Sequence, residues 1–237
     1  MATTFLQAMN QVLEVLQEDE IASGATEITS DYHKLIGNFM NQIKEEVEDA
    51  HNWRKLRTTQ DITISASSPT ATITSTTERS RLYYYPDEIS GILRPLVVDV
   101  TDSGSEQDLV EVDLPQILLM QQLNPSSTTP NSPQYFAIDD TSGDTLDIVV
   151  YPTPTTDRTI KITTIDPQAW IETDEISTEI TVPIAPIRMG TLWYALEERG
   201  EELGVNGLYS EERYRKALDV AISRDAAAQG EYQLVPV

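Results

Sequence analysis

Histidine and the carboxylates are the residues of this chain with the most obvious chemistry. The two histidines, His33 and His51, lie 18 residues apart in one helix-like stretch, which is about 27 Å at 1.5 Å per residue. They cannot bind one metal ion together. The acidic turns "DVTDSGSEQD" and "DDTSGDTLD" contain the carboxylates that a calcium site uses, but neither keeps the spacing D-x-[DN]-x-[DN]-G. We therefore expect no metal site and no cofactor.

Sequence motifs for catalysis are also missing. The chain contains no GxGxxG, GxxxxGK[ST], GxSxG or HExxH, so nucleotide-binding and common hydrolase sites are not indicated. Its 39 acidic residues offer too many carboxylate pairs for any one to be selected as an acid and base. We expect that the protein is not an enzyme. A hydrolase with an unrecognised carboxylate site is the third hypothesis, after the two given below.

The aromatic run "LYYYP" at 82–86 has two interpretations. It matches a carbohydrate-binding platform, and a β-sandwich binding module for carbohydrate or protein is our second hypothesis. Alternation along a strand instead places Tyr84 on one face and Tyr83 and Tyr85 on the other. In that case the run is an ordinary strand of a sandwich.

The net charge of −23 is unevenly distributed. Residues 1–60 carry −5, residues 61–185 carry −15 and residues 186–237 carry −3. Affinity for nucleic acid or anionic membrane comes from Lys and Arg, so such a surface repels both. No apolar run approaches the roughly 18–20 residues of a membrane span. Because the chain also lacks cysteine, we expect a soluble protein without disulfides, typical of a reducing compartment.

Helical periodicity marks both ends of the chain. Apolar residues follow a helical stripe in "TTFLQAMNQVLEVLQE", where Thr4 and Gln7 have capping-box spacing, and a longer helix opens after Thr29 or Ser30. From Pro186 the period returns: one helix stops at Gly204 and the last begins from a Ser210 cap. We expect the first of these to present one face formed by Met189, Trp193, Leu196 and Leu203.

The region between the helices is rich in Thr, Ser, Ile and Val with strand-like alternation from about Thr58. Strands are expected within 61–67, 70–75, 81–85, 93–101, 107–113, 134–138, 145–151 and 158–165, and a short helix between Pro115 and Leu123. Two N-terminal helices cannot bury a core alone, so we expect them to pack on the C-terminal pair. The predicted fold is α+β: a helical domain from residues 1–57 and 184–229, with an inserted antiparallel β-sandwich or small barrel at 58–183.

The last residues, "GEYQLVPV", have neither a cap nor helical spacing. We interpret 230–237 as an extended arm that becomes ordered on a partner chain, since alternating apolar positions suit a strand that pairs with another chain. Its candidate binding residues are Tyr232, Leu234, Val235 and Val237. A frayed tail is the alternative interpretation.

The order of these segments resembles the head-to-tail adaptors of short-tailed bacteriophages, also called tail tubular or connector proteins. The resemblance covers nearly all of the chain and rests on three diffuse motifs: a first helical region that ends in a tryptophan and a basic residue, a P-x-Y/F strand, and a strand that ends in "YPTP". Here these are Trp53 with Arg54, Pro133 to Phe136, and Tyr151 to Pro154.

The resemblance implies a structural protein of the virion neck or tail, present in the host cytoplasm before assembly. Such adaptors form a ring of twelve copies between the portal protein and a tail nozzle protein, and genomic DNA passes through the channel without tight binding. The helical domain and C-terminal tail contact the portal, and we expect the arm 230–237 to become ordered against the portal or a neighbouring adaptor subunit. The resemblance also implies that "DIVVYPTPTTDRTIKITTI", residues 147–165, forms two neighbouring strands joined by a proline-stiffened connection.

The charge distribution generates a test with duplex DNA. At physiological salt we expect the purified protein to bind duplex DNA no more tightly than about 1 mM, because its excess of carboxylates opposes contact with phosphates. Fluorescence anisotropy with a labelled duplex measures this. Micromolar binding that weakens as salt is added would contradict the expectation.

Overall fold

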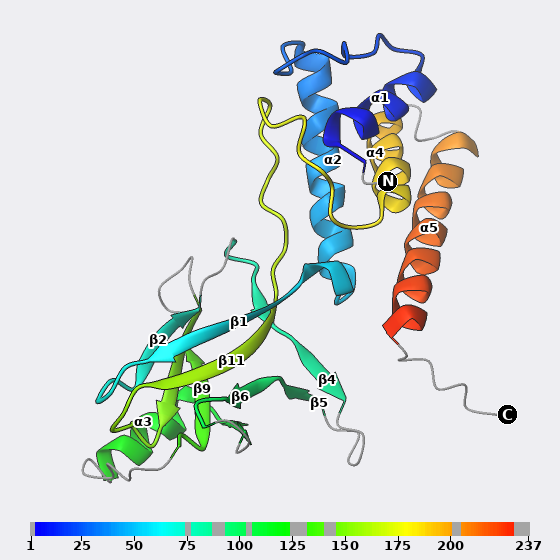
Figure 1. Cartoon of the computed structure of the whole chain (residues 1–237). Helices are drawn as coiled ribbons and strands as arrows, with labels where there is room; N and C mark the ends of the chain where they lie inside the picture. The colour runs from blue at the N-terminus through cyan, green and yellow to red at the C-terminus, as the bar shows by residue number, and fades with distance from the viewer. Residues whose placement is uncertain are drawn as a thin grey trace, which may run out of the picture. The chain divides into compact units, whose positions relative to one another are not determined.

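The computed structural model of the chain describes residues 3–73, 77–86, 93–102, 106–123, 132–139, 146–200 and 205–229. It consists of two compact units, and Figure 1 follows the chain through both. The first unit comprises the chain up to Leu56 and the chain from Ala169 onward, and the second is Arg57–Gln168. The predicted α+β class, with helices from both ends of the chain around an inserted β region, is confirmed.

The N-terminal helices begin as predicted. Helix α1 (Phe5–Leu16) has the expected capping box, because the Gln7 backbone N–H donates to Thr4 Oγ1 and the Thr4 N–H donates to Gln7 Oε1. Helix α2 (Asp31–Ala50) follows Ser30. Of the stripe expected from the periodicity, Ile36, Met40, Ile43 and Val47 are buried, whereas Phe39 is half-buried and Ala50 is exposed. The buried face also contains the polar residues Asn41, Lys44 and Glu48.

The C-terminal helices differ from the prediction at their boundaries. Helix α4 (Ile184–Glu198) ends before Gly200, whose φ of +73° is left-handed, rather than at Gly204. Helix α5 (Val205–Gln229) begins earlier than expected, so Ser210 lies inside the helix and is no cap. Of the predicted face of α4, Met189, Trp193 and Leu196 are only half-buried, and Leu203 lies outside the described residues.

The fully buried face of α4 is made of other residues. Ile187, Gly190, Thr191 and Ala195 are buried, and α4 contacts α1, α2 and α5. A Cβ on Gly190 would lie 2.7 Å from Ile43 Cγ2, closer than real side chains pack. The helix thus has neighbours on several sides, and its small residues let α2 approach closely. This explains why a single apolar stripe did not identify its core face.

The boundary between the two units also differs from the prediction. The segment 169–183, assigned from the sequence to the β domain, belongs to the helical unit. The Asn41 side chain donates to the Ile171 carbonyl (2.9 Å) and accepts from the Ile171 N–H (3.1 Å). Farther on, Phe5 and Leu6 donate backbone N–H groups to the carbonyls of Thr178 and Ile176. Side-chain and backbone bonds of the N-terminal helices therefore hold this segment.

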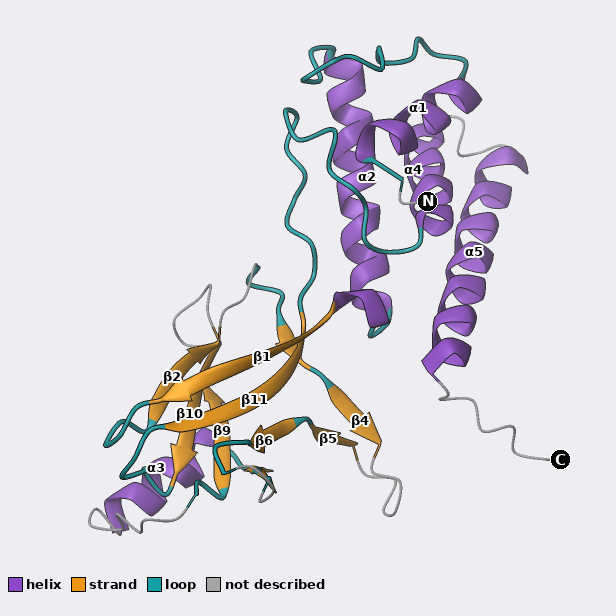
Figure 2. Cartoon of the chain, in the orientation of Figure 1, coloured by secondary structure: helices purple, strands orange, loops and turns teal. Residues whose placement is uncertain are grey.

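The β unit contains two main sheets and a short two-stranded sheet (Figure 2). The first sheet is antiparallel and contains β1 (Arg57–Ile64), β3 (Arg81–Leu82), β6 (Val97–Asp99), β7 (Gln107–Asp108) and β11 (Arg158–Ile165). The second contains β2 (Thr70–Ile73), β8 (Val110–Glu111), β9 (Tyr135–Asp139) and β10 (Leu146–Tyr151). In it β8 pairs with β9 in parallel, a departure from the all-antiparallel expectation. The short sheet pairs β4 (Tyr84–Pro86) with β5 (Leu93–Pro95).

The two main sheets share one hydrophobic core, which makes the unit a sandwich. Side chains from both sheets meet there, including Ile62 and Ile160 from the first and Phe136 and Ile148 from the second. Helix α3 (Leu114–Leu123), expected from the sequence, packs Ile117 against Ala137 and Val149 of the second sheet. The alternation of buried residues in these strands therefore fixes both faces of the second sheet.

The strands of residues 147–165 are not paired with each other, which corrects the expectation of neighbouring strands. Strand β10 pairs with β2 and β9, whereas β11 pairs with β1, β3 and β6 in the other sheet. The connection "PTPTTD" crosses between sheets, and Pro152 and Pro154 in it are buried. The motifs at Gln134 and Tyr151 are adjacent, because the Gln134 N–H donates to the Tyr151 carbonyl.

The contact at Gly190 can be tested by adding one methyl group. We expect Gly190→Ala to destabilise the helical unit by about 1–3 kcal/mol, because the buried Ile43 side chain must move. Urea unfolding followed by tryptophan fluorescence measures this, since Trp53, Trp170 and Trp193 all belong to this unit. Gly24→Ala is the matched control, since no atom lies within 4 Å of its added Cβ. Equal unfolding midpoints for the two variants would contradict the packing described here.

Candidate partner-binding groove

The arm residues predicted to bind a partner, Tyr232, Leu234, Val235 and Val237, lie outside the described residues. The other candidates from the sequence are distributed over both units. His33 lies in α2, and His51 Nε2 is 3.2 Å from Asp225 Oδ2. Within the described residues, no group of three or more His, Cys, Asp or Glu side chains is arranged to hold a metal ion.

The acidic turn that begins at Asp99 is paired with an arginine in the described part. Arg158 Nη1 lies 2.8 Å from Asp102 Oδ2 and 3.7 Å from Asp99 Oδ2. The second acidic turn falls mostly within 140–145, outside the described residues. Asp99 and Asp102 of the first turn therefore form an ion-pair cluster with Arg158.

The aromatic run at 82–86 takes part in packing. Tyr84 packs against the sandwich core and donates its hydroxyl to Glu111 (2.8 Å), and burial together with this carboxylate raises the pKa of Tyr84 to about 12. The Arg57 guanidinium stacks 3.8 Å from the centre of the Tyr83 ring. These contacts show that the run takes part in packing. It is not the single sandwich strand that the alternation suggested, because Leu82 belongs to β3 of the first sheet and Tyr84 to β4 of the short sheet.

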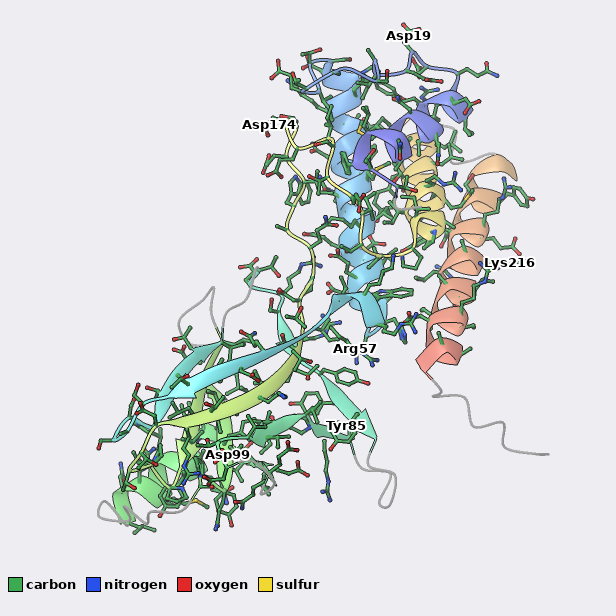
Figure 3. All side chains as sticks on the ribbon, in the orientation of Figure 1. Asp19, Arg57, Tyr85, Asp99, Asp174 and Lys216 are labelled. Carbon is green, nitrogen blue, oxygen red and sulfur yellow. The ribbon has the colours of Figure 1, made fainter. Side chains whose placement is uncertain are left out.

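A groove of about 610 Å³ runs along one face of α5 in the helical unit. Its α5 residues recur every three or four positions, so they share one face of the helix: Tyr209, Arg213, Lys216, Val220, Arg224 and Ala228. Figure 3 shows Lys216 on this helix. Ala185 and Met189 of α4 and Arg54 complete the walls. Its size is that of a site for a ligand or a short peptide segment.

The floor of the groove is apolar and open. Ala217, Val220 and Ala221 line it together with Met189, and Val220 is 41% exposed. Val220 and Tyr209 are two of the exposed large hydrophobic residues of the helical unit. Two such residues on one concave surface indicate a contact site for another segment.

The groove lining carries more cations than carboxylates in a strongly acidic protein: Arg54, Arg213, Lys216 and Arg224 against Glu212 and Asp225. Within the described part of the chain, the side chains of Arg54, Lys216 and Arg224 have no hydrogen-bond or ion-pair partner, although the chain has 39 acidic and only 16 basic residues. Arg213 lies over the Tyr209 ring at 5.1 Å. Three cations without carboxylate partners around an apolar floor favour an anionic ligand with apolar side chains.

The motif around Trp53 positions Arg54 at this groove. The buried Trp53 indole donates to the Val47 carbonyl at 2.6 Å, and its ring meets the His51 ring edge to face. Asp225 of α5 accepts a hydrogen bond from the Arg54 backbone N–H (3.2 Å). The end of α2 is therefore fixed against α5, which leaves the Arg54 side chain exposed at the rim.

A second cluster holds α5 against the other helices. Glu46 of α2 accepts hydrogen bonds from Tyr194 of α4 (2.7 Å) and Tyr214 of α5 (3.2 Å), and Tyr214 stacks on Trp193 with centroids 6.0 Å apart. Burial and the Glu46 carboxylate raise the pKa of Tyr194 to about 12 and raise that of Tyr214 as well. One carboxylate thus joins three helices and gives the groove a fixed wall.

The chemistry of the groove is suited to binding. The described residues that line it include no Ser, Thr, Cys or His, so they do not form the hydroxyl–imidazole or thiol–imidazole pair of common hydrolases. None of the helices in the described part of the chain is long and apolar enough to span a bilayer.

No known protein-family model matches the chain, and a comparison with curated proteins finds no match.

Reasoning from the sequence missed this groove. The signal that could have identified it is the three- to four-residue spacing of Arg213, Lys216, Val220 and Arg224. That pattern mixes charged and apolar residues, so it suggested an ordinary exposed helix face. Only the packing of α5 on α4 and on the end of α2 shows that the face is concave.

The raised tyrosine pKa values predict a loss of stability at high pH. Unfolded tyrosine ionises near pH 10, whereas folded Tyr194 ionises near 12. The stabilisation is therefore complete below pH 10 and is lost as the pH rises from 10 towards 12.

In the Tyr194→Phe variant, stability should fall less as the pH rises from 10 towards 12, because the variant has no phenol to ionise at this position. Urea midpoints from tryptophan fluorescence between pH 8 and 11.5 measure it, with Tyr209→Phe, at an exposed tyrosine of α5, as the matched control. Parallel pH profiles for wild type and Tyr194→Phe would refute the role of this cluster.

Proposed function

We propose that this chain is a structural head-to-tail adaptor of a short-tailed phage, without enzymatic activity. Copies of it, twelve by the resemblance, form a ring in the neck or tail of the virion. The ring joins the portal protein to the tail nozzle protein and surrounds the channel through which the genome passes. Before assembly the protein resides in the host cytoplasm.

The observation that carries this proposal is the discontinuous helical unit. Its two parts, the chain up to Leu56 and the chain from Ala169 onward, are separated in sequence by the whole β unit. The resemblance to adaptors implies this arrangement, with helices from both chain ends and an inserted β domain. Two contacts of the residues on which the resemblance rests support the proposal. Trp53 is buried just after α2, and the Gln134 N–H donates to the Tyr151 carbonyl.

The groove and the charge distribution support the same function. An adaptor needs protein-binding surfaces, and the face of α5 offers an apolar floor with the cations Arg54, Lys216 and Arg224. The chain as a whole is strongly acidic, with a net charge of −23. A wall with few cations binds DNA weakly and lets it slide past.

Assembly on a portal ring tests the proposal. Measured by light scattering, the isolated full-length chain should be largely monomeric and form a ring only when portal rings from the same phage are added. A chain truncated after residue 229 should melt at nearly the same temperature, yet load at least about tenfold less tightly. Its lost apolar side chains would have contributed several kcal/mol, less the entropy of ordering the arm.

Two results would contradict this function. A stable ring formed by the isolated chain would show that the portal is not the template. Unchanged loading of the truncated chain on portal rings would show that ring assembly there does not need the arm residues Tyr232, Leu234, Val235 and Val237.

A further inference from the structure

The groove on α5 and the segment that follows α5 have complementary chemistry. The groove combines an apolar floor around Val220 with the cations Arg54, Lys216 and Arg224, whose side chains have no ion-pair partner among the described residues. The segment 230–237, "GEYQLVPV", has one acidic residue, Glu231, and no basic residue. Its apolar side chains recur along the segment at Tyr232, Leu234, Val235 and Val237.

We propose that the groove along α5 binds residues 230–237 of a neighbouring copy of the chain. Each copy would then insert its segment into the next, which makes a head-to-tail contact of the kind that closes rings. The inference uses one part of the proposed function, the ring that brings two copies of the chain side by side. It assigns the groove to the neighbouring adaptor subunit, and not to the portal.

The dimensions of the two parts are compatible. The α5 face that lines the groove runs from Tyr209 to Ala228, about 28 Å at 1.5 Å per residue. Eight extended residues reach at most about 26–29 Å. The segment is therefore long enough to occupy most of the groove, with alternate side chains facing the floor as in a bound strand.

Residues 230–237 can bind in the groove of a neighbouring copy without the reversal of direction that binding in their own groove would need. Ala228 lines one end of the groove and lies only two residues before Gly230. To bind in its own groove, the segment would have to reverse within these residues and run back over the last turn of its helix. A segment that arrives from another copy needs no such reversal.

Electrostatics favours this contact over other contacts between copies. Two copies that each carry −23 repel one another. Arg54, Lys216 and Arg224 lack carboxylate partners in the described part of the chain, so an incoming Glu231 meets unpaired positive charge. Tethering within a ring raises the effective concentration of the segment to the millimolar range for short linkers, so micromolar intrinsic affinity suffices.

The experiment uses a peptide and needs no portal. A synthetic peptide of residues 230–237, amidated at its C-terminus and labelled at its N-terminus, is titrated with the chain truncated after residue 229 and with the full-length chain at nanomolar concentration. Fluorescence anisotropy should report saturable micromolar binding to both proteins, with dissociation constants within about threefold of one another. The affinity should fall as salt is raised.

Two substitutions test the site. Val220→Asp, which places a charge on the floor, should weaken peptide binding at least tenfold, because the apolar contact is lost and like charges meet. Val15→Asp is the matched control, since Val15 is also an exposed valine on a helix but lies on α1, away from the groove lining. It should leave the affinity unchanged. Leu234→Asp in the peptide should also abolish binding.

Each contrary outcome has a distinct meaning. No binding to the truncated chain, or equal binding by Val220→Asp, would overturn the inference. The peptide could also bind the truncated chain but bind the full-length chain at least tenfold more weakly. That result would show that the segment occupies its own groove, and it would also overturn the inference. If Val220→Asp abolished portal loading while no peptide bound, the groove would belong to the portal. If the peptide bound but the full chain never loaded on portals, only the adaptor proposal would fail.

Discussion

The helical unit depends on one constraint: two segments separated by the β unit must close around a single core. Helix α4 from the second segment packs against α1 and α2 from the first, and it can do so because Gly190 presents no side chain to Ile43. The close approach places Tyr194 within reach of Glu46. The positions of α5 and of its groove both follow from this contact.

Buried polar groups give the closure a single register. Lys44 and Glu48 of α2 are fully buried 3.6 Å apart, and Lys44 Nζ donates to the Ala169 carbonyl at 2.9 Å. Asn41 makes two further bonds to Ile171. Because an unpaired buried charge or amide is costly, the returning chain must meet α2 at these residues. Apolar packing alone would accept several registers.

The β unit is built by a different principle. Its strands alternate between a shared core and the outer faces, and the connection after Tyr151 carries the chain from one sheet to the other. This gives a sandwich in which β10 and β11, although consecutive in the sequence, belong to different sheets. The proposed adaptor would combine this rigid insert with a helical unit whose exposed α5 face remains available for binding. In a chain with so few cations, those on that face that have no carboxylate partner among the described residues are the main support for a partner.

The sequence by itself determined the α+β class, the capping box at Thr4, the start of α2 and the positions of the strand regions, because these depend on local periodicity and short-range hydrogen bonds. The predicted strands 81–85, 93–101 and 107–113 were wrong as single strands, because each divides into two strands that belong to different sheets. The tertiary structure decided the place of residues 169–183, the core face of α4 and the sheet of β11. Each of these depends on partners far away in the chain, such as Asn41 for Ile171. The groove is also a tertiary feature, since α5 has the same pattern whether its face is flat or concave. Only the packing of Met189 and Arg54 beside it makes a site.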